Sequence, residues 1–177
     1  AVLAAACSDD DGGAVASDSS TTSTSRASTT TTTDPAEALE AEIVDAYEAS
    51  SRAFIDAAAV PDPDFPAFVA THVGPMLEQR RSVLRGLQAD GRIIRYPASS
   101  QYRIDVDDIE IDGDVARLDV CVIDDGETVD AATGEVVAGG LGTVQARAAM
   151  QRVDGAWRLA ERRQEAEWEG IAGCATE

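Results

Sequence analysis

The chain has 177 residues and a formal net charge of −19 at pH 7, with 33 acidic and 14 basic residues. Its length leaves room for one folded domain of ordinary size, and such an acidic domain repels phosphate backbones, which excludes nucleic acid as a partner. All 14 basic residues are arginine, and with the abundant Ala, Asp, Val and Gly this indicates a GC-rich genome. A salt-adapted host is the alternative explanation for the acidity.

The first seven residues indicate export. An alanine run ends in Cys7, which is followed by Ser8 and three aspartates. Small residues before a cysteine, at the end of an apolar stretch, are what a bacterial lipoprotein signal peptide leaves at its cleavage point. We therefore expect residues 1–7 to be a signal-peptide remnant with a lipobox-like cysteine, and a lipid on Cys7 to hold the protein on the extracytoplasmic face of the cell membrane. Ordinary signal-peptidase cleavage after Ala6 is the alternative, and it gives a secreted protein.

Residues 8–34 form a segment rich in Ser and Thr. Up to Thr33 it contains no aromatic residue and one large aliphatic residue, Val15. Such a segment cannot bury enough apolar surface to offset its chain entropy. We expect a disordered tether over residues 8–34, followed by one domain with a C-terminal tail over residues 35–177.

Three helices are expected in the first half of that domain. The run Asp34-Pro35-Ala36-Glu37 is typical of a helix start, with a capping Asp, proline at the first helical position and Glu three residues after the cap. Apolar residues at spacings of three and four predict a helix over residues 35–59. Three prolines then allow a short helical segment near residues 65–69, and a third helix begins at Gly74 and stops at Asp90-Gly91.

From Arg92 onward the apolar pattern alternates, which predicts strands. A short strand begins at Ile93, and alternating stretches follow at 102–111, 118–122, 144–150 and 157–159. Hairpin turns are expected at 111–115, 131–134 and 153–156. We expect the strand that passes Val106 to continue after a bulge or kink. Helices followed by an antiparallel meander predict an α+β domain with helices covering one face of a curved sheet.

The long first helix, the Gly113-Asp114 hairpin and the closing Asp154-Gly155-Ala156-Trp157 hairpin resemble the nuclear transport factor 2-like superfamily, which includes SnoaL-like polyketide cyclases and ketosteroid isomerases. This resemblance covers roughly residues 36–165. It implies a cone-shaped, curved antiparallel sheet with the N-terminal helices packed on its concave face. A strand cysteine followed by Val-Ile-Asp-Asp, and a terminal Gly-Ile-Ala-Gly-Cys, resemble exported lipoproteins of GC-rich Gram-positive bacteria.

Cys121 and Cys174 remain once Cys7 is set apart. In an exported domain two remaining cysteines usually pair, so we expect a disulfide between them, with two buried free thiols as the alternative. If Leu118 and its alternating neighbours point inward, Cys121 points outward and meets the C-terminal segment on the convex side. The same alternation makes Asp119 and Arg147 a surface ion pair of little energetic value.

The resemblance also implies an apolar pocket between the first helix, the third helix and the concave face of the sheet. The pocket-lining candidates are Tyr47, Tyr96, Tyr102 and Trp157. Enzymes of the superfamily that isomerise or cyclise a substrate use an inward Asp as base and a Tyr or second acid to stabilise the oxyanion. The candidates for these roles are Asp108 and Tyr102, and His72 is a further catalytic candidate as a general base. Asp108 equally fits a bulge in an exposed acidic cluster, and His72 equally fits a capping or packing role at a helix end.

The sequence contains no nucleophile elbow, phosphate-binding loop or metal-binding run, so we expect no cofactor and no metal. The function expected is a non-enzymatic, lipid-anchored extracytoplasmic binding or accessory domain. Its candidate partners are the membrane, through the lipid, and a small apolar ligand or a cell-envelope protein. The alternative is a small-molecule isomerase, cyclase or hydratase of the SnoaL-like type.

Overall fold

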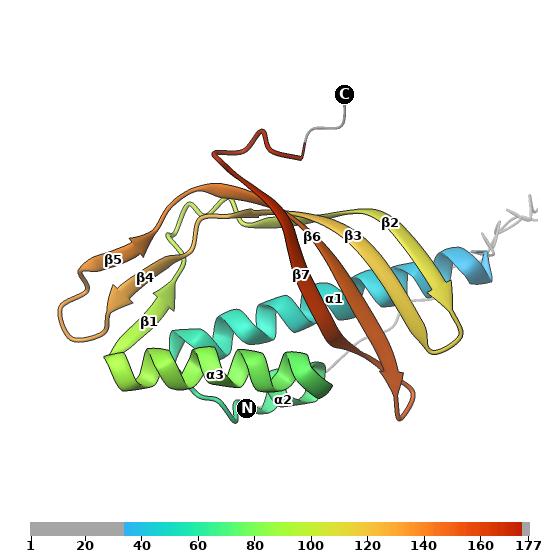
Figure 1. Cartoon of the computed structure of the whole chain (residues 1–177), viewed down its shortest axis with the longest axis horizontal. Helices are drawn as coiled ribbons and strands as arrows, with labels where there is room; N and C mark the ends of the chain where they lie inside the picture. The colour runs from blue at the N-terminus through green and yellow to red at the C-terminus, as the bar shows by residue number, and fades with distance from the viewer. Residues whose placement is uncertain (1–33, 175–177) are drawn as a thin grey trace, which may run out of the picture. The chain divides into compact units, whose positions relative to one another are not determined.

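The computed structural model describes residues 34–174, which form three helices and then seven strands (Figure 1). The signal-peptide remnant, the lipidation site Cys7 and the tether up to residue 33 lie outside the described residues. The helices are α1 (Pro35–Ala59), α2 (Pro66–Thr71) and α3 (Gly74–Asp90). The strands are β1 (Arg92–Arg95), β2 (Arg103–Asp112), β3 (Val115–Asp124), β4 (Glu127–Asp130), β5 (Val136–Gly139), β6 (Gly142–Val153) and β7 (Ala156–Glu169).

Local signals define the ends of the long helices. The Asp34 side chain accepts a hydrogen bond from the Ala36 N–H at 2.9 Å, and Pro35 occupies the first helical position, so α1 begins where the sequence predicted. Helix α3 ends at Asp90 and is capped by Gly91, whose φ of 65° is the left-handed conformation that glycine adopts most easily. Within the described residues no helix has the length and apolar character needed to cross a membrane.

The strands form two antiparallel sheets that share two long, bent ribbons. Four strands pair in the order β2-β3-β6-β7, and three pair in the order β1-β4-β5. Only Asp125 and Gly126 separate β3 from β4, and only Gly140 and Leu141 separate β5 from β6, so each ribbon runs through both sheets and bends between them (Figure 1). The bulge expected beyond Val106 is present as a register shift in β2.

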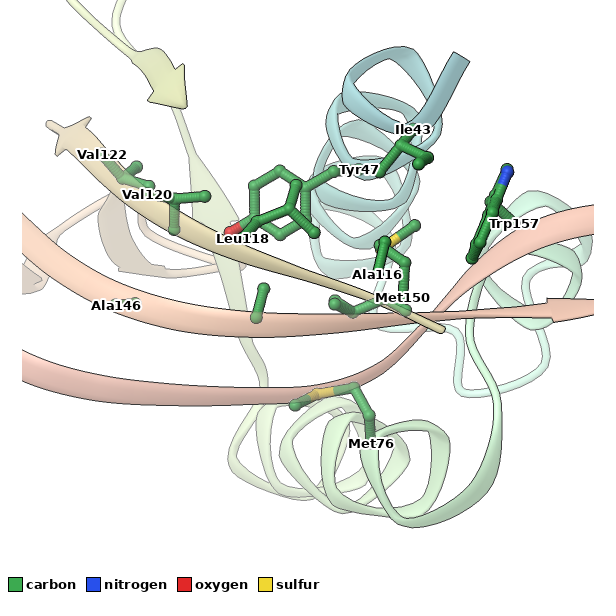
Figure 2. Close-up of a cluster of buried hydrophobic side chains, with 12 residues drawn as sticks. Ile43, Tyr47, Met76, Ala116, Leu118, Val120, Val122, Ala146, Met150 and Trp157 are labelled. Atoms are coloured by element: carbon green, nitrogen blue, oxygen red, sulfur yellow. The ribbon is translucent and has the colours of Figure 1, made fainter. Parts of the chain in front are cut away.

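The helices pack on the concave side of the curved four-stranded sheet, as expected (Figure 1). Buried residues of β3 and β6 meet Ile43 and Tyr47 of α1 and Met76 of α3 (Figure 2). A second cluster joins the C-terminal half of α1 to Phe68 of α2 and Leu84 of α3. The apolar stripe of α1 therefore serves both clusters, first against the sheet and then against the other two helices.

The expected disulfide between Cys121 and Cys174 is confirmed, with the two Cα atoms 5.9 Å apart. Cys121 alternates along β3 with residues of the concave core, so the bond lies on the other face of the strand. The C-terminal segment folds back over this face, where the Thr143 hydroxyl donates to the Gly170 carbonyl at 2.6 Å. The bond therefore fixes the end of the chain against the middle of the sheet.

Removal of this disulfide should destabilise the domain. Because the bond closes a loop across a sequence separation of 53 residues, the chain-entropy model predicts a loss of about 4 kcal/mol in the free energy of unfolding. Urea unfolding of the oxidised protein and of the double variant Cys121→Ser/Cys174→Ser measures the difference. The reduced native sequence should match the variant, and equal stability of the oxidised and variant proteins would show that the bond adds nothing.

Candidate functional site

A pocket of about 180 Å³ lies where α1 and α3 face the bend between the two sheets. Helix α1 contributes Tyr47, Ser51, Phe54 and Ile55, while α3 contributes Arg80. The strands contribute Ile94 of β1, Val122 and Asp124 of β3, Thr128 of β4 and Arg162 of β7. Tyr96, Tyr102 and Gly126 come from the segments between strands. A wider hollow of about 450 Å³ shares Ile55, Tyr96 and Tyr102 with this pocket. The wall thus combines an apolar part with hydroxyl and guanidinium groups.

All three tyrosines of the chain line the pocket. The rings of Tyr96 and Tyr102 pack edge to face with their centroids 5.3 Å apart. Burial is the main cause that raises the pKa of Tyr102 to about 12, and burial together with the charge of Asp124 raises the pKa of Tyr96 further. Both phenols therefore keep their protons at neutral pH and act as hydrogen-bond donors.

Arg80 and Arg162 supply the positive charge of the wall. The Arg80 guanidinium lies over the ring of Phe54, 3.9 Å from its centroid, while the Nε of Arg162 donates to the Tyr47 hydroxyl at 3.3 Å. Burial and the nearby charge of Arg162 lower the pKa of Arg80 to about 10. Arg80 therefore remains a cation at neutral pH, although its environment disfavours the charge.

Asp124 is the carboxylate among the residues that line the pocket. Its Oδ1 accepts from the Tyr96 hydroxyl at 3.0 Å and from the Gly126 N–H at 2.9 Å. Two donors thus hold this oxygen in place at the bend of the sheet. Within residues 34–174, no group of three His, Cys, Asp or Glu side chains is arranged to hold a metal ion.

The prediction that Trp157 lines the pocket is wrong. Trp157 is 5% exposed and belongs to the core between α1 and the sheet, away from Val122 (Figure 2). It pairs with Arg152 at one end of the sheet, whereas Val122 lies near the far end of β3, beside the bend. Its position at the start of β7 therefore keeps its ring out of the pocket, which Tyr47, Tyr96 and Tyr102 line.

Asp108 and His72 lie outside the pocket. Asp108 follows the bulge in β2 and lines a groove of about 350 Å³ on the convex side, with Asp119 and Arg147. Those two form the expected surface ion pair at 3.0 Å. His72 is 1% exposed, with its Nδ1 3.0 Å from the Phe68 carbonyl and its ring against that of Phe68. It therefore packs and caps at the end of α2, one of the two roles that the sequence left open.

The pocket wall also includes residues that were not predicted from the sequence, among them Ser51, Arg80, Asp124 and Arg162. Arg80 carried a readable signal, because it stands three residues after Leu77 and four before Leu84, on the apolar stripe of α3. The sequence pattern around Arg162 did not indicate a pocket position. A register shift opposite Ala149 and Met150 pairs Arg162 with the core residue Ala148, whereas alternation counted from Leu159 places it on the outer face.

No family model matches the chain, and no curated protein matches it. The structure is similar to the intermembrane space region of the chloroplast protein ARC6, with a TM-score of 0.57, 16% sequence identity and coverage of 73% of this chain and 96% of that chain. It is also similar to Kfla4162 from Kribbella flavida (TM-score 0.47, 16% identity, 75% of this chain and 95% of that chain). A further similar structure is the NTF2-like protein SPO1084 from Silicibacter pomeroyi DSS-3 (TM-score 0.39, 13% identity, 71% of this chain and 98% of that chain).

At these identities the likeness concerns the fold alone. Three helices precede a curved antiparallel sheet and cover its concave face, which is the α+β arrangement that the sequence predicted. Function must therefore be argued from the pocket and its side chains.

The buried position of His72 makes the stability of the domain depend on pH. Burial is the main cause that lowers the pKa of His72 from 6.5 to about 4, so between these values the unfolded chain binds a proton that the folded chain does not. Stability should fall as the pH drops from 7 to 4, with a contribution from this residue of up to about 3 kcal/mol.

Urea unfolding of the native protein and of His72→Asn at the two pH values isolates the effect. Because His72 is the one histidine of the chain, NMR titration of its ring also reads the folded pKa directly. We expect the native protein to lose more stability than the variant on acidification. A ring that titrates near 6.5 in the folded protein contradicts this account.

Proposed function

We propose that the domain is a non-enzymatic binding domain, held at the extracytoplasmic face of the membrane by a lipid on Cys7, that takes a small molecule into the pocket between α1, α3 and the sheet. The observation that carries this proposal is the pocket wall itself. Apolar side chains of α1 and the sheet stand next to fixed hydroxyl and guanidinium groups, a combination typical of small-molecule sites. Its volume of about 180 Å³ favours a ligand of few atoms.

The positions of the candidate catalytic groups favour binding over catalysis. An isomerase or cyclase needs a base within hydrogen-bond reach of the substrate. Asp108 lies on the convex side and His72 lies in the core, so neither can serve a substrate in this pocket. Asp124 does face the pocket, where its Oδ1 accepts from the Tyr96 hydroxyl and the Gly126 N–H. It is the one carboxylate of the wall on which the alternative, enzymatic function would depend.

Two features of the chain support an extracytoplasmic location. Cys7 follows an alanine run and precedes a polar segment, as in a lipoprotein. The disulfide between Cys121 and Cys174 fits an oxidising compartment, because structural disulfides persist there and are rare in a reducing cytosol.

NMR of the full chain labelled with ring-¹³C tyrosine should detect ligand entry. All three tyrosines line the pocket, whereas neither Trp157 nor Trp168 does. The probes are phenol, cyclohexanol, benzamide and benzoate at millimolar concentration. We expect at least one probe to shift tyrosine signals saturably and to leave the signals of a tryptophan-labelled sample in place.

A pocket-filling variant tests whether those shifts come from the pocket. Ser51→Leu places a larger side chain in the wall, and Ala49→Leu adds the same side chain at an exposed position of α1. The shifts should disappear in the Ser51 variant and persist in the Ala49 variant. If no probe moves a tyrosine signal, or if the shifts survive in the Ser51 variant, small-molecule binding in this pocket is rejected.

Cell fractionation tests the anchor separately. The full-length gene is expressed in a Gram-positive host with and without Cys7→Ala, and the intact mass of the mature protein is measured. We expect a diacylglyceryl mass and membrane-bound protein for the native sequence, and release into the medium for the variant. Native protein that carries no lipid and appears in the medium would indicate a secreted domain.

A further inference from the structure

Arg80 of α3 and Arg162 of β7 meet at the same pocket without an acidic partner. Within residues 34–174, neither guanidinium has a carboxylate oxygen within salt-bridge distance. The chain has more than twice as many acidic as basic residues, so carboxylates are abundant on its surface. The wall does hold one carboxylate, Asp124, but it forms no ion pair with either cation.

The other arginines of the described residues behave differently. One group forms ion pairs, namely Arg81, Arg92, Arg95, Arg103, Arg147, Arg158 and Arg163. The second group is exposed to solvent, namely Arg52, Arg85, Arg117 and Arg152. Arg80 and Arg162 are partly buried and belong to neither group. Water or a protein carboxylate stabilises the charge of each of the other arginines, whereas Arg80 and Arg162 face the pocket.

The contacts that Arg80 and Arg162 do make are made with neutral groups. The Arg80 guanidinium lies on the face of the Phe54 ring, and the Nε of Arg162 donates a hydrogen bond to the Tyr47 hydroxyl. Removing a guanidinium from water without a counter-charge is costly, and a neutral acceptor or an aromatic face offsets only part of that cost. The lowered pKa of Arg80 has this burial and the charge of Arg162 as its main causes. An anion in the pocket would offset both the cost of burying the Arg80 charge and its repulsion from Arg162.

We propose that the ligand of this pocket is a small organic monocarboxylate, with its anionic group on the Arg80 and Arg162 guanidinium groups and its apolar part against the ring and aliphatic side chains of the wall. This inference rests on the proposed function, and it names the ligand class. The planar N–H donors of a guanidinium match the two oxygens of a carboxylate. Phe54, Ile55 and Val122 provide the apolar contacts.

Asp124 sets the charge of the ligand at one. Its carboxylate faces the same pocket and is held by Tyr96 and Gly126, so the wall carries two positive charges and one negative charge. A dianion would meet repulsion from Asp124 that a monoanion largely avoids, because a single carboxylate group can lie on the arginine side of the pocket.

Matched pairs of probes test the inference on the full chain labelled with ring-¹³C tyrosine. Benzoate is compared with benzamide, and cyclohexanecarboxylate with cyclohexanol, while inorganic phosphate tests for a preference for anions without an apolar part. We expect each carboxylate to bind at least about tenfold more tightly than its neutral counterpart, the factor expected for hydrogen bonds to a charged group.

Variants then identify the charges responsible. Arg162→Gln and Arg80→Gln should each weaken benzoate binding by about tenfold or more and should weaken benzamide binding by a smaller factor. Arg85→Gln removes the same charge from an exposed position of α3 and should change neither. Thermal unfolding of each variant shows whether it is folded. If Arg80→Gln does not fold, Arg162→Gln and the probe pairs on the native chain decide the question alone.

The outcomes separate the two proposals. Equal binding of carboxylates and neutral counterparts, or carboxylate binding that survives both arginine variants, overturns the monocarboxylate inference and leaves small-molecule binding standing. Binding of phosphate in preference to benzoate also overturns it. If no probe of any class moves a tyrosine signal, both proposals fail together.

Discussion

The close approach of two backbones at the bend of the sheet is the constraint on which the pocket depends. Gly139 has a φ of 125°, and a Cβ on it would lie 2.5 Å from the Gly126 carbonyl oxygen and 2.8 Å from the Glu127 Cα. Only glycine fits there, and its lack of a side chain lets the two ribbons bend at the same point along the sheet. Asp124 and Gly126, which stand at this turn, are part of the pocket wall. A flatter sheet would carry these groups away from α1 and α3.

The bend also explains why charged groups stand so close to the core. Along α1, Tyr47 is fully buried in the main cluster, and one turn later Ser51 faces the pocket. The main cluster thus ends where the sheet turns, and polar side chains stand beside apolar ones in the pocket that follows it. Arg80 and Arg162 are among these polar side chains, so two cations without an ion pair line the pocket of a chain whose net charge is −19.

The sequence predicts those parts of the fold that local chemistry determines. Asp34 and Pro35 define the start of α1, Gly91 the end of α3, and the alternation of Leu118 with Val120 the inner face of β3. The site depends on longer-range geometry, which such patterns do not contain. The register shift in β7 turns Arg162 inward, and the sheet pairing takes Trp157 to the far end of the core. The shift reverses the inward positions that follow it, and the pairing of Trp157 with Arg152 places Trp157 at the end of the sheet away from the bend.

The disulfide connects the C-terminal segment to the geometry of the pocket. Cys121 and Val122 are neighbours on β3 and point to opposite faces of the sheet. Cys121 holds the C-terminal segment on one face, and Val122 lines the pocket on the other. Strand β7, which carries Arg162, is an edge strand, and edge strands lack a partner on one side. The chain beyond it is held by Cys174 and by the Gly170 contact with Thr143. The disulfide therefore stabilises the strand that brings a guanidinium to the pocket.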